Sequence, residues 1–327
     1  MAVTVLVSRN DALRTHPPAG DSRLSVNGSN WLFTVTSIFG LATLVFWALK
    51  FRARGGERFF HYLFIITSLT GLIAYYAMAS DLAWVPIRQA NSVGHSGLVR
   101  QIFWAKYVFW VVAFAAIVIA LGVLSGVAWA TIVYNVALTW TWVIGYLVAA
   151  FTPSNFKWGF FAWAFLAHIF VLVSLWFRGS RSADRVGIRR DYFALTGWVT
   201  FLWLLYPLAW GLTDGGNFNG VTGSFIWFGI LDILLFLGTG FAIIFLSSRW
   251  DYGRLNIAFT QYGRVPAQPG TFPEKAPQPA AGAGAGAAPA AAPAAAPAAA
   301  PAAAPAAAPA AGPATTTTAT AANTATV

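Results

Sequence analysis

Seven long apolar runs constrain this chain more than any other feature of its sequence. They span residues 31–49, 59–80, 98–121, 127–151, 158–177, 192–212 and 224–246. Each is close to the roughly 20 residues that a helix needs to cross a bilayer, and none alternates with the two-residue period of a barrel strand. Because only helices or closed barrels satisfy the backbone inside lipid, the sequence predicts an all-α bundle of seven transmembrane helices with the lipid bilayer as its first partner.

The composition agrees with a multi-pass membrane protein. Hydrophobic residues make up 58% of the chain and charged residues only 9%, whereas soluble domains carry about a quarter charged residues. The chain has no cysteine, which excludes disulfides, thiol chemistry and cysteine-bound metals. Its net charge of +10 comes from basic residues in short loops between apolar runs, so it indicates membrane orientation rather than a nucleic-acid partner.

Basic residues gather on alternate connections. The first connection, the fifth connection and the segment after the last run carry Lys50, Arg52, Arg54, Arg58, Arg178, Arg181, Arg185, Arg189, Arg190, Arg249, Arg254 and Arg264. The positive-inside rule then puts the N-terminus outside and the C-terminus in the cytoplasm. Asn27 begins an Asn-Gly-Ser glycosylation sequon on the outer side, very close to the first helix.

Three regions follow from this pattern. Residues 1–30 are polar, lack the apolar core of a signal peptide, and are expected to form a flexible extracellular N-terminus. Residues 31–250 form the seven-helix domain. Residues 251–327 are rich in alanine, proline and threonine, and proline at every fourth position of 297–309 forbids a continuous helix. We expect a disordered cytoplasmic tail with no catalytic chemistry.

Among the polar side chains within the apolar runs, we single out Lys106, His168 and Asp232. Lys106 could extend its ammonium group to the outer interface, or it could pair with Asp232 inside the bundle. We favour the ion pair, because a lone buried carboxylate would otherwise have to take up a proton. For His168, a hydrogen-bonded interior histidine is a simpler interpretation than a proton carrier or a ligand.

Several motifs together resemble the microbial (type I) rhodopsins, especially their fungal branch. The sixth run contains WLLYPLAW at 203–210, similar to the W-x-x-Y-P-x-x-W signature of that family. The third run has Trp104, Lys106, Tyr107 and Trp110 in similar spacing, and the seventh has Asp232 followed by Gly238 and Gly240. Residues 74–80 and 157–161 are further points of similarity, and the likeness extends over about 30–254.

The departures from the family bear on function. The resemblance places the retinal-binding lysine at Phe236, the counter-ion carboxylate at Phe109 and the cytoplasmic proton donor at Ala120. A phenyl ring cannot form an imine, so covalent retinal and light-driven proton pumping are not expected. The family's retinal-pocket positions fall on Tyr107, Phe109, Trp110, Phe161, His168, Trp203, Tyr206, Pro207, Trp210 and Asp232. Lys106 stands where the family usually has arginine and could neutralise Asp232, with Tyr75 and Tyr206 donating hydrogen bonds.

The pattern is similar to fungal opsin-related proteins that lack the retinal lysine, a group that includes yeast heat-shock plasma-membrane proteins. This resemblance implies a non-photochemical stress-response or chaperone-like regulator at the plasma membrane. The implied partners are a membrane protein such as the plasma-membrane proton ATPase and further copies of the chain. Two alternatives stay open: a receptor that binds a retinoid non-covalently among Trp110, Trp203, Tyr206 and Trp210, and a residual ion path through Lys106, Asp232 and His168. No metal-ligand spacing, nucleophile constellation or phosphate-binding loop predicts an enzyme.

Overall fold

The computed structural model describes residues 10–53, 56–90 and 98–250. All of them lie in the first of two compact units, Met1–Thr271. The predicted disordered tail, 251–327, lies outside the described residues.

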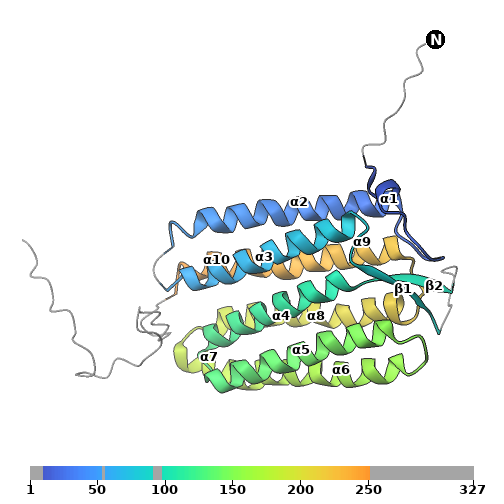
Figure 1. The fold of residues 1–327 in the computed structure, drawn as a ribbon. Coiled ribbons are helices and arrows are strands. Elements are labelled where there is room, and N and C mark those ends of the chain that lie inside the picture. The colour runs from blue at the N-terminus through green and yellow to red at the C-terminus, as the bar shows by residue number, and fades with distance from the viewer. Residues whose placement is uncertain (1–9, 54–55, 91–97, 251–327) are drawn as a thin grey trace, which may run out of the picture. The chain divides into compact units, whose positions relative to one another are not determined.

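Seven helical spans in the described part of the chain are long and apolar enough to cross a membrane, which confirms the predicted architecture (Figure 1). Four are single helices. Each of the other three contains a π-helical turn, η1, η2 or η3. The elements are α2 (Val26–Leu49), α3 (Arg58–Ala79), α4 (Trp104–Ser125), α5 (Trp129–Phe151), α6 (Lys157–Val173) with η1 (Ser174–Gly179) and α7 (Ser180–Val186), α8 (Arg189–Trp210) with η2 (Gly211–Gly215), and α9 (Val221–Asp232) with η3 (Ile233–Gly238) and α10 (Thr239–Ser247).

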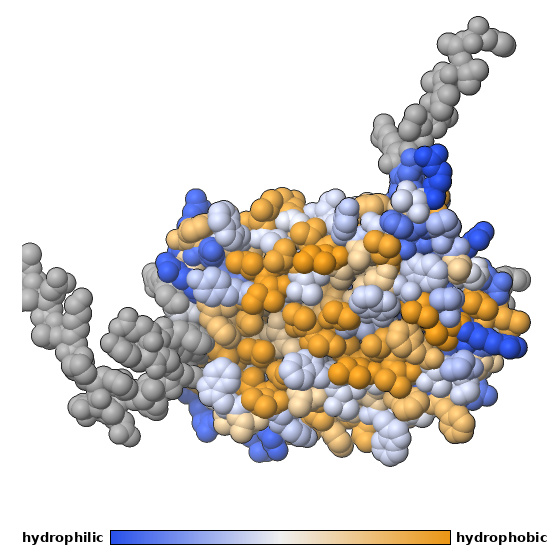
Figure 2. Space-filling view, in the orientation of Figure 1, coloured by the Kyte–Doolittle hydropathy of each residue, from blue (hydrophilic) through white to orange (hydrophobic). Residues whose placement is uncertain are grey.

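The helices are apolar on nearly all sides, as expected when the outer face meets lipid and the inner face meets other helices. The α4 span is the most enclosed: 78% of the 18 residues in its apolar segment are buried, compared with 33% for α2. Large side chains such as Leu44, Val133 and Phe201 are exposed on the outside of the bundle. Figure 2 shows apolar side chains covering the middle of one face of the bundle, with hydrophilic residues toward its two ends.

A β-hairpin closes one end of the bundle, which we call the hairpin end. Its strands β1 (Trp84–Arg88) and β2 (Val99–Phe103) pair antiparallel, with Val85 opposite Ile102. The third predicted helix therefore begins too early: residues 99–103 form a strand, and α4 starts at Trp104. Hydropathy could not separate them, because β2 is almost entirely buried and runs directly into the helix. We call the other end, where α7 turns into α8, the α7 end (Figure 1).

The segment before the first span is folded where the structure describes it. A short helix α1 (Ala12–Thr15) precedes Ser22, which forms a bridge to Arg100 of β2. Ser25 caps α2, which begins at Val26, by accepting a hydrogen bond from the Gly28 amide. The described residues 10–30 thus depart from the predicted flexible segment: residues 12–15 and 26–30 are helical, and the hairpin binds the backbone of Asp21, Ser22 and Leu24. Asn27 lies in the first turn of α2, and its glycosylation stays a prediction.

Candidate functional site

Asp232 lies at the centre of the bundle, at the end of α9, and is fully buried. Three neutral donors from three other helices bind its carboxylate: the Tyr75 hydroxyl at 2.5 Å, the Tyr206 hydroxyl at 2.6 Å and Trp110 Nε1 at 3.1 Å. The predicted hydrogen bonds from Tyr75 and Tyr206 are therefore present, and Trp110 adds a third donor. A buried carboxylate with three such donors is well solvated by the protein itself.

Lys106 does not pair with Asp232, so the predicted ion pair is wrong. Its Nζ lies 2.6 Å from Asp214 Oδ2, and its side chain is almost completely buried, which also contradicts the interface-seeking alternative. The reason is that Lys106 and Asp232 lie at different depths in the bundle. Lys106 is in the first turn of α4, whereas Asp232 contacts Trp110, four residues or about 6 Å further along the helix. Asp214 lies in η2, at the hairpin end.

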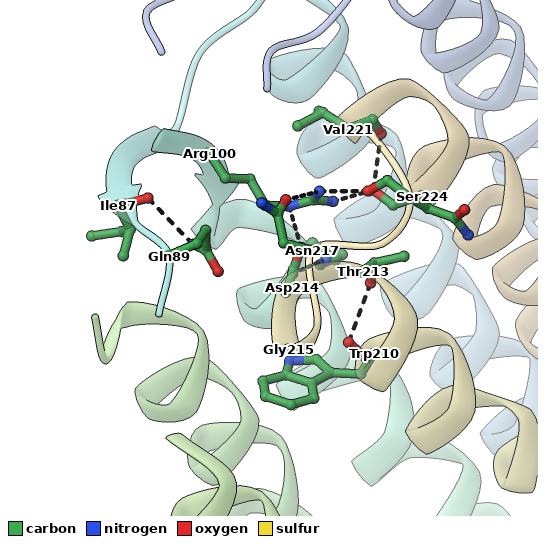
Figure 3. A network of polar contacts seen from close by, with 12 residues as sticks. Ile87, Gln89, Arg100, Trp210, Thr213, Asp214, Gly215, Asn217, Val221 and Ser224 are labelled. Atoms are coloured by element: carbon green, nitrogen blue, oxygen red, sulfur yellow. Dashed lines mark hydrogen bonds and ion pairs between the residues drawn. The ribbon is translucent and has the colours of Figure 1, made fainter. Parts of the chain in front are cut away.

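Arg100 of β2 is the second cation at Asp214. Its Nε lies 3.3 Å from Asp214 Oδ1, and the side chain has no exposed surface. Burial lowers the pKa of Arg100, and the adjacent Asp214 carboxylate opposes that shift. Figure 3 shows the guanidinium reaching from the hairpin toward the loop after η2. It donates hydrogen bonds there to Asn217 Oδ1, the Asn219 carbonyl and Ser224 Oγ.

A third buried cation, Lys157, begins α6 at the same end. Its Nζ donates to Gln89 Oε1 at 2.8 Å and to the carbonyls of Asp214 and Gly215, each at 3.1 Å. We call Arg100, Lys106, Lys157 and Asp214 the charge cluster. Within the described ranges, Asp214 is the one carboxylate at ion-pair distance from these cations, so the cluster carries an excess of positive charge.

Sequence reasoning missed Asp214 and Arg100. Asp214 follows the predicted sixth helix by two residues, in a glycine-containing stretch that is typical of a loop. In the structure, the π-helical turn η2 continues the helix through this stretch, and Asp214 is buried. Arg100 was hidden in the predicted third run. A count of charges at the ends of the runs would have given a signal, since Arg100, Lys106 and Lys157 all fall at the hairpin end.

Phenyl rings fill the bundle next to Asp232. Phe236, one helical turn after Asp232, is fully buried in η3, and its ring centroid lies 4.9 Å from that of Phe109. Phe114 packs on the other side of Phe236 at 5.3 Å. Ala120 is also buried on α4. Phe109 and Phe236 thus bring two apolar rings together where the family resemblance would require a carboxylate and an amine, and Ala120 has no carboxylate where the resemblance would require the proton donor.

A second region, which we call the aromatic chamber, lies between α5, α6 and α8. Its members are Trp142, Tyr146, Phe161, His168, Trp203 and Trp210. His168 stacks on Trp142 with centroids 4.0 Å apart, and Phe161 contacts both Tyr146 and Trp210, which also contact each other. The predicted pocket positions Tyr206, Pro207 and Trp210 lie on the buried face of α8, and Trp210 Nε1 donates to the Tyr107 hydroxyl.

His168 is interior, but it is not the hydrogen-bonded histidine that we expected. Neither ring nitrogen has a partner among the described protein atoms, and the same holds for Trp203 Nε1. Of the three residues on the predicted ion path, Lys106 binds Asp214 and Asp232 binds Tyr75, Tyr206 and Trp110, whereas His168 binds neither of the other two. The hydrogen bonds of the described residues therefore do not link Lys106, Asp232 and His168 into one chain.

Comparisons with known proteins agree with this geometry. A model of the bacteriorhodopsin-like protein family matches residues 27–252. The protein FDD123 of Trametes versicolor is 36% identical over 72% of this chain and 83% of its own length. The 30 kDa heat shock protein of Saccharomyces cerevisiae is 28% identical over 70% of this chain and 76% of its own. The solved structure of a light-driven proton pump from Leptosphaeria maculans is 27% identical, has a TM-score of 0.65, and is matched over 72% of this chain and 98% of its own.

Proposed function

The chain belongs to the bacteriorhodopsin-like family of multi-pass membrane proteins, and from this premise we propose that it works without covalent retinal. In this proposal it is a stress-response or chaperone-like regulator at the plasma membrane, with its N-terminus outside. It acts through contact with a membrane-protein partner, such as the plasma-membrane proton ATPase, or with further copies of itself.

One observation supports the first half of the proposal. The ring of Phe236, which the family resemblance puts at the position of the retinal lysine, packs inside the bundle against Phe109 and Phe114. An amine is needed to form a Schiff base, and Phe236 has none. Phe109 removes a carboxylate that would have no cationic Schiff base to face and would be costly to bury.

The second half rests on likeness. The relative from Saccharomyces cerevisiae is named a heat shock protein, and its similarity covers most of both chains. We extend that association with stress to this chain. The similarity to the light-driven pump from Leptosphaeria maculans supports a common fold. Phe236 has no amine for a Schiff base, so we do not extend light-driven pumping to this chain.

The proposal is tested by deleting the protein from its host and measuring survival and proton-ATPase activity after heat or acid stress, in light and in darkness. We expect the deletion to reduce both and the wild-type chain to restore both equally well in the dark. A visible spectrum of the purified protein with all-trans retinal should show no band that hydroxylamine bleaches. Restoration that needs light, or a hydroxylamine-sensitive pigment, would contradict the proposal.

A second candidate function is supported by the aromatic chamber. His168 and Trp203 keep three ring nitrogens without partners inside a wall of aromatic rings, and buried polar groups normally have partners. A flat apolar ligand with one polar end, such as a retinoid held non-covalently, would give one of these nitrogens a partner.

Thermal unfolding with added all-trans retinol tests this candidate. Binding at 100 times the dissociation constant stabilises a protein by about 2.7 kcal/mol, and His168→Phe should reduce that gain. Unchanged unfolding of the wild-type protein at saturating retinol would exclude retinol as the ligand.

A further inference from the structure

A basic pocket lies at the α7 end of the bundle, far from the charge cluster. It has a volume of about 490 Å³ and opens between the start of α5 and the segment that joins α6 to α8. Its lining consists of Val127, Ala128, Thr131, Arg178, Arg181 and Arg185. We call it the arginine pocket.

The pocket carries the positive charge of three arginine side chains. In the residues that the structure describes, no carboxylate lies at ion-pair distance from Arg178, Arg181 or Arg185. Arg185 donates to the hydroxyl of Ser182, and the nearby Asp184 is paired with Arg189 instead. Three guanidinium groups around one concavity form a site for an anion with several oxygens, because each can bind a phosphate through two parallel hydrogen bonds.

The surroundings of the pocket indicate that this anion belongs to a lipid. The Arg178 guanidinium lies 6.0 Å from the ring centroid of Tyr134, which is on the outer face of α5. Val133 of α5 and Phe177 of η1, each one residue from Tyr134 or Arg178 in the sequence, are more than 60% exposed, as expected for side chains that contact acyl chains. The guanidinium groups therefore lie where an apolar surface ends at a turn between helices, at the depth of lipid headgroups.

We propose that the arginine pocket binds the headgroup phosphate of an anionic phospholipid, whose acyl chains lie along the outer faces of α5 and α6. The same arginines led to the predicted cytoplasmic location of this end, and the cytoplasmic leaflet is the one that carries anionic lipids. The binding site itself is independent of the proposed regulatory role, since it rests on the shape and charge of the pocket alone.

The test uses the full-length protein purified in a neutral detergent. Short-chain phosphatidylinositol, short-chain phosphatidylcholine and inorganic phosphate are titrated separately, and binding is followed by native mass spectrometry and by the unfolding temperature. We expect phosphatidylinositol to bind and stabilise the protein, and the other two to do so much more weakly. Equal binding of phosphatidylcholine would overturn the anionic specificity, and equal binding of inorganic phosphate would overturn the lipid assignment.

Variants locate the site. Replacing Arg178, Arg181 and Arg185 together by glutamine should weaken phosphatidylinositol binding on the order of 100-fold, from the loss of three basic contacts. The matched control replaces Arg52, Arg190 and Arg249 by glutamine. This change removes the same amount of charge at the same end of the bundle but outside the arginine pocket. Arg181→Gln alone should weaken binding about fivefold and serves if the triple variant does not fold. An equal loss in the control, or no loss in the pocket variants, would overturn the proposal.

Discussion

Lys106 and Asp214 form a buried ion pair with 2.6 Å between Nζ and Oδ2, so Asp214 has a different kind of partner from Asp232. Asp214 is bound by cations at the hairpin end, whereas Asp232 is bound by neutral hydroxyl and indole donors at the centre. The bundle thus keeps a carboxylate at its centre without an adjacent cation at ion-pair distance in the described residues.

The pairing of Lys106 predicts a specific coupling pattern. In double-mutant cycles of unfolding in detergent micelles, Lys106→Met and Asp214→Asn should couple by about 1–3 kcal/mol. Lys106→Met and Asp232→Asn should couple by less than about 0.5 kcal/mol, since the two residues share no direct contact. The reverse order would contradict the ion pair in the structure.

Asp214 should matter more to stability than Lys106. Asp214→Asn leaves Arg100 and Lys106 buried without a counter-charge and should destabilise the protein by about 3–5 kcal/mol. Lys106→Met keeps Asp214 paired with Arg100 and places an apolar side chain near Phe228, so its cost should be smaller. Denaturant unfolding of the two single variants compares them directly.

The donors around Asp232 should contribute to stability individually. Tyr75→Phe and Tyr206→Phe each remove a short hydrogen bond to a buried carboxylate, so each should cost about 1–3 kcal/mol. Tyr76→Phe is the matched control, because Tyr76 is the next residue on α3 but is 58% exposed. If all three variants unfold alike, the hydrogen bonds to Asp232 do not stabilise the fold.

The packing of Phe236 predicts a cavity effect. Phe236→Ala removes a fully buried ring that contacts Phe109 and Phe114, and should destabilise the protein by about 3–5 kcal/mol. Phe201→Ala, at a position that is 61% exposed on the outside of α8, should cost less than about 1 kcal/mol. Equal effects at the two positions would show that Phe236 does not fill the interior.

Asp81 predicts a pH dependence of stability. Burial raises its pKa to about 6 from an ordinary value of 3.8, while a hydrogen bond from Gln101 and the nearby His16 oppose the shift. The folded protein therefore holds this proton more tightly than the unfolded chain does. The resulting stabilisation is present below about pH 4 and is lost as the pH rises to about 6.

Asp81→Asn removes this titratable group, so the difference between the two proteins isolates the contribution of Asp81 from that of other groups. At about pH 7 the variant should be more stable than the wild type by about 1–3 kcal/mol, and the difference should shrink toward zero near pH 4. Thermal unfolding of both proteins across this range measures the difference. A difference that does not change with pH would contradict the raised pKa.

The sequence predicted the parts of the fold that depend on hydropathy alone. All seven spans were found because each is a long apolar run. Tyr75 and Tyr206 were predicted as donors to Asp232, whereas the third donor, Trp110, was not. Helix depth could not be read in the same way. Lys106 and Asp232 both lie inside apolar runs, but only the structure shows that about one helical turn separates their levels in the bundle.

The hairpin end could not be predicted because its elements depend on partners far along the chain. β2 is a strand only because β1 pairs with it, and Ser22 joins it from the other side. Asp214 turns inward only because η2 extends α8 beyond its apolar run. Local patterns carry no information about such contacts.

The position of Lys157 has a consequence for the order of assembly during membrane insertion. Its ammonium group joins α6 to Gln89, 68 residues earlier, and to the Asp214 carbonyl, 57 residues later. The bond to the Asp214 carbonyl cannot form until the sixth span has crossed the bilayer, whereas the bond to Gln89 needs only α6. Until then, the hairpin end lacks this hydrogen bond between α6 and η2. Its hydrogen bonding is therefore completed late in membrane insertion, after most of the chain has been synthesised.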